Sequence, residues 1–352
     1  MSSQYSIDLV PGYTISRLLK GGWQLAGGHG LVDRDAAIAD MAAYYEAGIT
    51  TFDCADIYTG VEEMIGEFRR DYVARKGRDS LRDLRVHTKY VPDLATLPAL
   101  DRQQVERTID RSLSRLGVER LDLVQFHWWD YNVPRYLETA RWLTELQRAG
   151  KIAHLGGTNF DTAHTRELVE GGTPLVSMQV QYSLLDQRPL PVLSPFCAGA
   201  GMQLLCYGTV AGGFLSERWL GRSEPTDDLE NRSLVKYKLM IDDFGGWDLF
   251  QQLLAALKVI AERHAVTIPT IAMRWVLQQP RVAAIIVGVR RGDHLPDHLR
   301  VMQATLDPAD LAELDAVLAQ RRLLDGDVYS SERDLEGRHG RVMKYDLNET
   351  PH

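Results

Sequence analysis

The chain has 352 residues, 45% of them hydrophobic and 25% charged, which is typical of a soluble globular enzyme. A net charge of −8 argues against a nucleic-acid partner, and the absence of a stretch of about 18 apolar residues argues against a membrane span. Three cysteines form no CxxC pair, and the N-terminus lacks the features of a signal peptide. We therefore expect a cytoplasmic protein, and the sequence leaves its oligomeric state open.

Short apolar strands alternate with amphipathic helices along the first half of the chain. The pattern predicts strands at 16–23, 50–52, 84–90 and 121–126, and helices at 35–47, 62–70, 101–116 and 134–149. Glycines end several of these helices, as Gly117 does after 101–116. The second strand runs directly into the polar residues that begin with Asp53.

The alternation continues in the second half. It predicts strands at 151–155, 175–180, 202–206 and 282–289, and helices at 162–170, 190–198, 249–264, 269–278 and 308–319. The segment 208–247 has no clear period and is expected to be a long lid or binding loop. The segment 324–352 is expected to be an extended tail.

Eight apolar strands, each followed by a helix, predict a parallel sheet closed into a (β/α)₈ TIM barrel. The barrel is expected to cover about 16–320 of a single domain, because no linker or internal repeat divides the chain. The alternative is a doubly wound sheet of the Rossmann type. That fold needs a G-x-G-x-x-G fingerprint at the start of a helix, and the pairs Gly21-Gly22 and Gly27-Gly28 have the wrong context.

Polar residues stand at three successive strand ends. Asp53 and Tyr58 follow the second strand, Lys89 follows the third and His127 the fourth. In a parallel barrel these ends meet at one rim, where chemistry is placed. Asp53 would hold Lys89 charged, the ammonium would lower the pKa of Tyr58 against the effect of burial, and His127 would donate a hydrogen bond to a substrate oxygen. The set suits proton donation to a carbonyl.

Each of these residues also has an ordinary structural explanation. Asp53 could cap a helix, Tyr58 could be a packing residue, and His127 could be a core histidine before two tryptophans. A buried lysine such as Lys89 rarely lacks a functional or ionic partner. The four together favour an active site. No ligand spacing such as H-E-x-x-H indicates a metal.

The segments around these positions resemble the aldo-keto reductase superfamily. The resemblance covers about 18–318 and is carried by 51–58, 88–89, 122–127, 156–160, Gln179, 207–208 and 286–288. It implies a (β/α)₈ barrel that transfers hydride between a nicotinamide cofactor, usually NADPH, and a carbonyl. The catalytic tetrad of the family falls on Asp53, Tyr58, Lys89 and His127, with Tyr58 as the proton donor.

The resemblance also implies cofactor and substrate contacts. Thr158, Asn159 and Gln179 would hold the carboxamide, Tyr207 would stack on the nicotinamide, and the backbone from Gly208 through Val210 to Phe214 would follow the pyrophosphate. Trp23 and Trp128 would wall the substrate site. The full set of implied cofactor contacts is Gly22, Trp23, Thr158, Asn159, Gln179, Tyr207, Gly208, Val210, Gly288, Arg290, Arg291, His294 and His298.

Two departures from the family pattern leave specificity open. His294 stands where an arginine is usual, and Asp297-His298 stand where Glu-Asn is usual. Arg290 and Arg291 could pair with a 2′-phosphate, which favours NADPH/NADP+, with NADH possible. The charged tail differs from that of the common reductases, so the physiological substrate is not determined.

These observations favour an NADP(H)-dependent oxidoreductase acting on a small-molecule carbonyl or alcohol. The alternative is a cofactor-binding regulatory or scaffold subunit with weak or no turnover. A third option, an isomerase or aldolase that uses Lys89 as a Schiff base, is disfavoured because Asp53 would keep the lysine charged.

Overall fold

Eight parallel strands form a closed barrel in the computed structural model, which describes residues 4–27, 30–226, 229–289 and 292–348. The strand order around the barrel is β10-β3-β4-β5-β6-β7-β8-β9, so neighbours in the chain are neighbours in space. The strands are β3 (Leu18–Gly21), β4 (Thr51–Asp53), β5 (Arg85–Tyr90), β6 (Leu121–Phe126), β7 (Ile152–Thr158), β8 (Leu175–Gln181), β9 (Gln203–Tyr207) and β10 (Val282–Gly288). The predicted (β/α)₈ barrel is confirmed.

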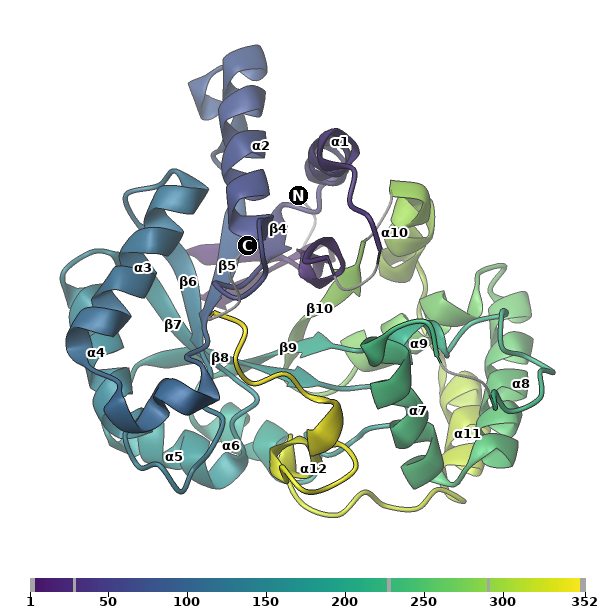
Figure 1. Cartoon of the computed structure of the whole chain (residues 1–352). Helices are drawn as coiled ribbons and strands as arrows, with labels where there is room; N and C mark the ends of the chain where they lie inside the picture. The colour runs from purple at the N-terminus through teal and green to yellow at the C-terminus, as the bar shows by residue number, and fades with distance from the viewer. Residues whose placement is uncertain (1–3, 28–29, 227–228, 290–291, 349–352) are drawn as a thin grey trace.

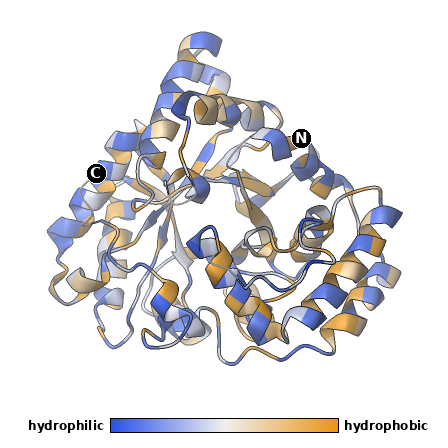
Figure 2. Ribbon diagram, turned by 45° about the vertical axis from the view of Figure 1, so that its right-hand side comes forward, coloured by the Kyte–Doolittle hydropathy of each residue, from blue (hydrophilic) through white to orange (hydrophobic). Residues whose placement is uncertain are grey.

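Helices surround the barrel and bury one face each against it (Figure 1). The nine helices that match predicted ones are α1 (Arg34–Glu46), α2 (Val61–Lys76), α3 (Arg102–Leu116), α4 (Tyr136–Arg148), α5 (Thr162–Glu170), α6 (Leu193–Gly199), α8 (Trp247–Arg263), α9 (Ile268–Leu277) and α11 (Pro308–Leu318). Hydrophobic and hydrophilic residues occupy different sides of the outer helices (Figure 2). In α3, a capping box between Asp101 and Gln104 starts the helix and left-handed Gly117 ends it.

An antiparallel hairpin precedes the barrel, and the sequence did not predict it. Its strands are β1 (Ser6–Val10) and β2 (Tyr13–Ser16). Leu9, Tyr13 and Ile15 of the hairpin are buried in one cluster with barrel residues such as Leu123 and Leu205. The hairpin therefore closes the end of the barrel opposite the carboxyl ends of the strands.

The segment 208–247, expected to be an irregular loop, contains the helix α7 (Arg232–Phe244). Asn231 caps its start by accepting a hydrogen bond from the backbone of Leu234. Tyr237, Ile241 and Phe244 are buried at helical spacing. The loop prediction was wrong for this part, because lysines and aspartates interrupt the apolar period of the helix, and one of them, Lys236, faces Glu332 of the tail. A second unpredicted helix, α10 (Leu295–Gln303), follows β10.

The C-terminal tail crosses the mouth of the barrel. It forms a short helix, α12 (Ser330–Arg333), and in Figure 1 the yellow segment passes in front of the strands. The tail reaches the β5 side, where the backbone of Leu94 donates to Tyr345 O at 3.0 Å. Among the described helices, none is long and apolar enough to span a bilayer.

Candidate active site

A buried ion pair connects the ends of β4 and β5. Lys89 Nζ lies 2.6 Å from Asp53 Oδ1 and also donates to the carbonyl of Cys54 at 2.8 Å. The second oxygen, Asp53 Oδ2, accepts from the side-chain amides of Gln125 at 3.0 Å and Gln179 at 2.7 Å. Both charged side chains are at most 6% exposed. A pair this well satisfied by hydrogen bonds is the arrangement under which a buried charge persists.

Register explains why these residues meet. Lys89 pairs with Gln125 across β5 and β6, and Asp53 with His87 across β4 and β5. Side chains alternate between the inside and outside of a strand, so Lys89 and Gln125 face the barrel interior together.

Tyr58 lies in the turn after β4, beside the lysine. Lys89 Nζ is 4.9 Å from the centroid of the Tyr58 ring, and the Trp23 ring centroid is 5.1 Å away. Burial raises the pKa of the Tyr58 phenol and outweighs the positive charge of Lys89, which lowers it. The sequence left open which of the two opposing effects on the pKa of Tyr58 is larger, and in the structure it is burial. At neutral pH Tyr58 carries its proton, as a proton donor must.

Lys89 stays charged. Burial alone would lower the pKa of this ammonium, but the negative charge of Asp53 raises it above its ordinary value. A permanently protonated amine is not a nucleophile, which argues against the Schiff-base alternative.

His127 is held as a neutral ring. Its Nδ1 lies 3.0 Å from the carbonyl oxygen of Thr158, which only accepts, so Nδ1 carries a proton. Burial lowers the pKa of His127 to about 3, with a smaller contribution from the charge of Arg333. The other nitrogen, Nε2, is therefore a bare lone pair, buried and without a partner in the described structure. The sequence expectation that His127 donates to a substrate oxygen is corrected, because in this tautomer Nε2 accepts.

The aromatic residue beside His127 is Trp129. The two ring centroids are 4.2 Å apart, and the Trp129 indole donates to Pro92 O at 2.9 Å. Trp128, which was expected to wall the substrate site, has no exposed surface and donates to the carbonyls of Asp130 and Val133. That expectation is not met, because the Trp128 ring packs beside Phe126 of β6 and Tyr136 of α4. Trp23 is 37% exposed at the rim beside Tyr58.

The residues expected to hold a nicotinamide ring come together at the ends of β7, β8 and β9. Thr158 pairs with Gln179 across β7 and β8. Tyr207 Oη donates to Asn159 Oδ1 at 2.9 Å, and Asn159 adopts a left-handed φ of 60°, unusual for a residue other than glycine. Such local strain is typical of functional sites.

The segment after β9 lies under α7. A Cβ on Gly208 would be 2.3 Å from the hydroxyl of Tyr237, and one on Gly212 would be 2.7 Å from the same ring. Both glycines have left-handed φ values. They are required for this close packing, whatever their part in ligand binding. Val210 lies between them and is partly buried.

The residues expected to contact the adenosine end of the cofactor do not all lie together in the structure. His298 is buried on α10 and its Nδ1 lies 2.9 Å from Tyr44 Oη, whereas His294 is exposed. Gly288 ends β10 against the side chain of Gln24. Arg290 and Arg291 lie outside the described residues.

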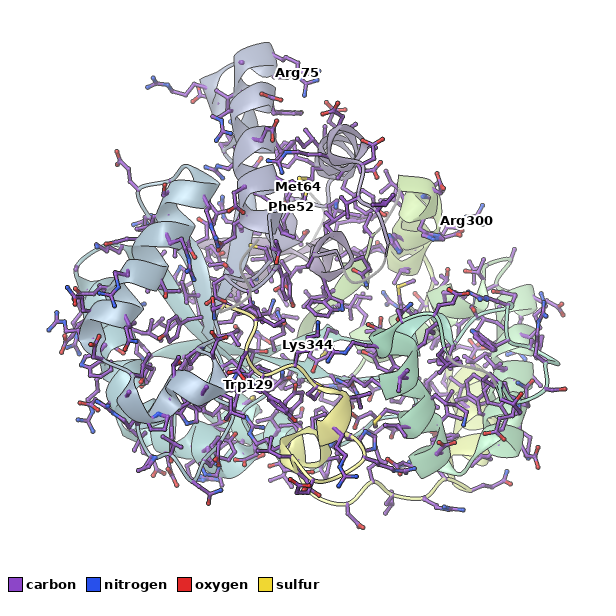
Figure 3. All side chains as sticks on the ribbon, viewed as in Figure 1. Phe52, Met64, Arg75, Trp129, Arg300 and Lys344 are labelled. Atoms are coloured by element: carbon purple, nitrogen blue, oxygen red, sulfur yellow. The ribbon has the colours of Figure 1, made fainter. Side chains whose placement is uncertain are left out.

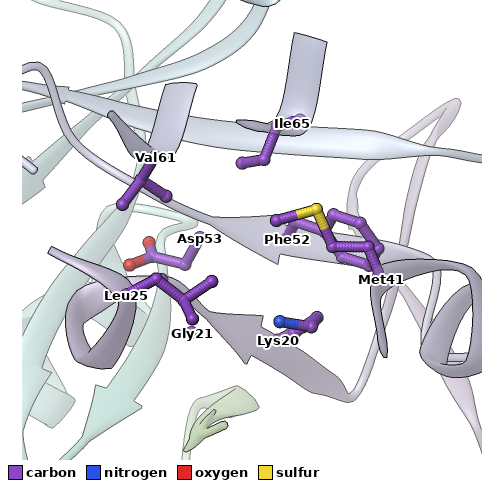
Figure 4. A pocket seen from close by; sticks show the side chains of 9 residues that line it. Lys20, Gly21, Leu25, Met41, Phe52, Asp53, Val61 and Ile65 are labelled. Atoms are coloured by element: carbon purple, nitrogen blue, oxygen red, sulfur yellow. The ribbon is translucent and has the colours of Figure 1, made fainter. Parts of the chain in front are cut away.

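A small cavity lies behind Asp53 and Gly22, between β3, β4 and the helices α1 and α2 (Figure 4). Its volume is about 10 Å³, enough for a single water molecule. Gly22 is needed here, because a Cβ would lie 2.7 Å from Val61 Cγ1. Lys20 also lines the cavity, and burial lowers its pKa to about 8.

Sequence reasoning missed five residues that surround the site. Gln125 could have been found, because it is a polar residue on the inward face of an apolar strand. The other four belong to α7 and the tail, where nothing in the local pattern indicates a position over the barrel. These five residues are Gln125, Lys236, Tyr329, Glu332 and Arg333.

A protonated phenol, a buried Asp–Lys pair and a neutral histidine therefore stand together at the carboxyl end of a (β/α)₈ barrel. Within the residues that the structure describes, no cluster of His, Cys, Asp or Glu could hold a metal. The fold and the site define a (β/α)₈ barrel of the enzyme type, with acid/base side chains gathered at the carboxyl ends of its strands.

Comparison with known proteins identifies the family. The family model for the Aldo/keto reductase family matches residues 17–319. The chain is 26% identical over 312 residues to an NADH-specific methylglyoxal reductase of Escherichia coli, covering 84% of this chain and 93% of that protein. It is 27% identical over 334 residues to the aldo-keto reductase YhdN of Bacillus subtilis, covering 90% and 93%. A glycerol dehydrogenase from Gluconobacter oxydans shares the fold with a TM-score of 0.75 and 24% identity, covering 92% of this chain and 98% of that one.

The chain belongs to the aldo/keto reductase family. It is accordingly an oxidoreductase of the carbonyl reductase or alcohol dehydrogenase type, a class that uses a nicotinamide cofactor.

Proposed function

We propose that this protein is an NADP(H)-dependent reductase that converts an aldehyde or ketone to an alcohol, or catalyses the reverse reaction, with Tyr58 as the proton donor. The observation that carries the proposal is the pair Asp53–Lys89 at 2.6 Å, with Lys89 Nζ at 4.9 Å from the Tyr58 ring. It keeps a positive charge beside a protonated phenol. Such a charge stabilises the negative oxygen that develops as a carbonyl is reduced.

The residues at the ends of β7, β8 and β9 suit the nicotinamide. The amide nitrogen of Gln179 donates to Asp53 and Gln125, so its Oε1 is the atom that can accept a hydrogen bond from a carboxamide. Asn159 accepts from Tyr207 through Oδ1, which leaves its amide nitrogen as a donor. When bound, the cofactor supplies or accepts the hydride at the carbonyl carbon.

Side chains of the protein then transfer the proton and stabilise the charge that its transfer leaves. Tyr58 gives its hydroxyl proton to the carbonyl oxygen, while Lys89 stabilises the charge that remains on the phenol oxygen. His127 Nε2 accepts a hydrogen bond from the hydroxyl of the alcohol, because its Nδ1 proton is held by Thr158 O. The tetrad therefore recognises the alcohol with His127 and protonates the carbonyl with Tyr58.

Cofactor choice is the finer part of the proposal. Arg290 and Arg291 favour the 2′-phosphate of NADPH, whereas the E. coli relative is named NADH-specific. Replacing both arginines with alanine is expected to weaken NADPH binding much more than NADH binding. Equal losses of affinity for the two cofactors would show that these arginines do not bind the 2′-phosphate.

The direct test measures binding and turnover separately. Purified protein is titrated with NADPH and NADH by fluorescence, and oxidation of each is then followed with aldehydes, ketones and sugars. Turnover that depends on Tyr58 supports the enzyme. Tight cofactor binding without turnover on any carbonyl would instead favour a regulatory or scaffold subunit.

A further inference from the structure

The tail places one guanidinium beside the catalytic histidine. Arg333 Nη1 donates to the carbonyl of Asn159 at 2.7 Å, and Nη2 donates to the carbonyl of Trp128 at 2.8 Å. Trp128 directly follows His127, and Asn159 directly follows Thr158, whose carbonyl accepts from His127. The guanidinium is thus fixed at the ends of β6 and β7, one residue away from the catalytic centre on each strand.

Within the part of the chain that the structure describes, the positive charge of Arg333 has no acidic partner. Among residues 4–27, 30–226, 229–289 and 292–348, no carboxylate oxygen lies within 4.0 Å of it, and its known bonds go to neutral carbonyls. Its Nε is buried and makes no hydrogen bond with the described residues. Aromatic rings cover the guanidinium, with Cζ 4.2 Å from the Tyr131 centroid and 5.3 Å from the Tyr329 centroid. Cation–π contacts favour the charge without neutralising it.

The neighbouring residue fixes the tail in this position. Glu332 is fully buried and lies 3.2 Å from Arg188 and 3.5 Å from Lys236. Burial would raise the pKa of Glu332, but the charges of Lys236 and Arg188 lower it to about 2, so the anchor is ionised. Tyr329 adds a left-handed φ of 60° and an edge-to-face contact with His127 at 5.8 Å.

Figure 3 shows the tail near Lys344 passing close to Trp129, and the Trp129 and Tyr345 ring centroids are 5.1 Å apart. The tail is therefore tied to the barrel on both sides of Arg333. A side chain held in this way is preorganised, so little conformational entropy is lost when it binds a ligand.

We propose that Arg333 is a specificity-determining residue that selects carbonyl substrates carrying a carboxylate close to the reacting carbonyl. The inference rests on the proposed reductase function. A guanidinium has five N–H donors in a planar fork that matches a carboxylate, and backbone carbonyls use only two of them. A substrate carbonyl bound at Tyr58 and His127 would lie beside the strand ends to which Arg333 is bound through Trp128 O and Asn159 O.

Arg333 could instead serve only to dock the tail. The two roles differ in what they do to substrates. A docking residue affects charged and uncharged substrates alike, whereas a recognition residue affects only the charged ones.

The test compares substrates that differ only in charge. Succinic semialdehyde is measured against methyl 4-oxobutanoate, and 4-carboxybenzaldehyde against methyl 4-formylbenzoate. We expect the wild type to favour the charged member of at least one pair by about 10-fold or more in kcat/KM, mainly through KM. No preference in either pair would overturn the inference.

Three variants then assign the preference to Arg333. Arg333→Gln removes the charge and should abolish the preference while the esters are still reduced. Arg333→Lys keeps the charge and should retain part of it. Arg341→Gln makes the same change at a tail arginine that is 69% exposed, and should leave the preference unchanged. Equal losses for acids and esters in Arg333→Gln would overturn the inference. If that variant does not fold, the wild-type ratios and Arg333→Lys decide.

A binding measurement separates this inference from the proposed function. If no aldehyde is turned over, the reductase proposal fails, and benzoate binding to the wild-type protein is measured by calorimetry with and without NADP+. Binding that weakens in Arg333→Gln but not in Arg341→Gln supports a carboxylate site. Binding that is absent, or equal in all variants, overturns it.

Discussion

The strand ends of the barrel and the C-terminal tail both supply polar groups to the same mouth, but they are positioned by different means. Asp53, Lys89 and Gln125 are fixed by the register of neighbouring parallel strands. Arg333 and Tyr329 are fixed by a buried charge cluster around Glu332. The barrel positions its residues through repeated backbone pairing, whereas the tail depends on a small number of ionic, hydrogen-bonding and aromatic contacts. We therefore expect the tail to be the more easily disrupted of the two.

The largest expected effect comes from removing the anchor of the tail. Glu332→Gln leaves Lys236 buried without its carboxylate, while Arg188 keeps its pair with Asp186 at 2.8 Å. Breaking a buried pair in this way costs about 3–5 kcal/mol. We expect a lower melting temperature and faster amide exchange across 324–345. The control is Glu336→Gln, since Glu336 is 90% exposed. Similar exchange in both variants would contradict the anchoring role.

The strand-end site is tested by Tyr58→Phe. The ring and its contacts with Lys89 and Trp23 remain, but the proton donor is lost. Turnover should fall by about 10²-fold or more, equivalent to about 2.7 kcal/mol, with cofactor affinity near that of the wild type. Turnover of a reactive aldehyde close to the wild-type rate would show that another group donates the proton.

The barrel interior should respond to pH through His87. Burial lowers the pKa of His87 to about 3 from an ordinary value of 6.5, and its Nε2 lies 3.1 Å from Tyr13 Oη. Between these values the unfolded chain binds a proton that the folded chain does not. The stability contribution is therefore complete above pH 6.5 and is lost as the pH falls toward 3.

The measurement compares the wild type with His87→Gln. The free energy of unfolding of the wild type should decline more steeply with falling pH below 6.5, by up to about 1.4 kcal/mol per pH unit. Urea unfolding at several pH values measures this slope. Parallel slopes for the two proteins would mean that His87 has the same pKa in the folded and unfolded states.

The smallest effect concerns α7, the element between the barrel and the tail. Its residues Tyr237, Ile241 and Phe244 are buried, and Tyr237 packs on Gly208 and Gly212. We expect slow amide exchange across 232–244 even without cofactor, and faster exchange across the exposed residues 221–226. Fast exchange across the whole of 221–244 that slows with NADP(H) would restore the lid that the sequence suggested.

The sequence was sufficient to predict the barrel and the four polar residues at its strand ends. Eight apolar strands with helices between them predict one closed parallel sheet, and residues at its strand ends must converge. Asp53, Tyr58, Lys89 and His127 were predicted to lie at one rim in this way, because their positions depend on local pattern and on a repeated architecture. The assignments of cofactor residues came from resemblance, and they stay predictions.

Only the tertiary structure decided the rest. The proton position on His127 depends on the carbonyl of Thr158, which belongs to another strand. The difference between Trp128 and Trp129 depends on which face of the loop meets the core. Arg333 lies 174 positions from Asn159 in the chain, and its placement follows from the buried charges of Glu332, Arg188 and Lys236. Local periodicity carries no information on such long-range contacts, because they form only when the barrel and the tail are folded together.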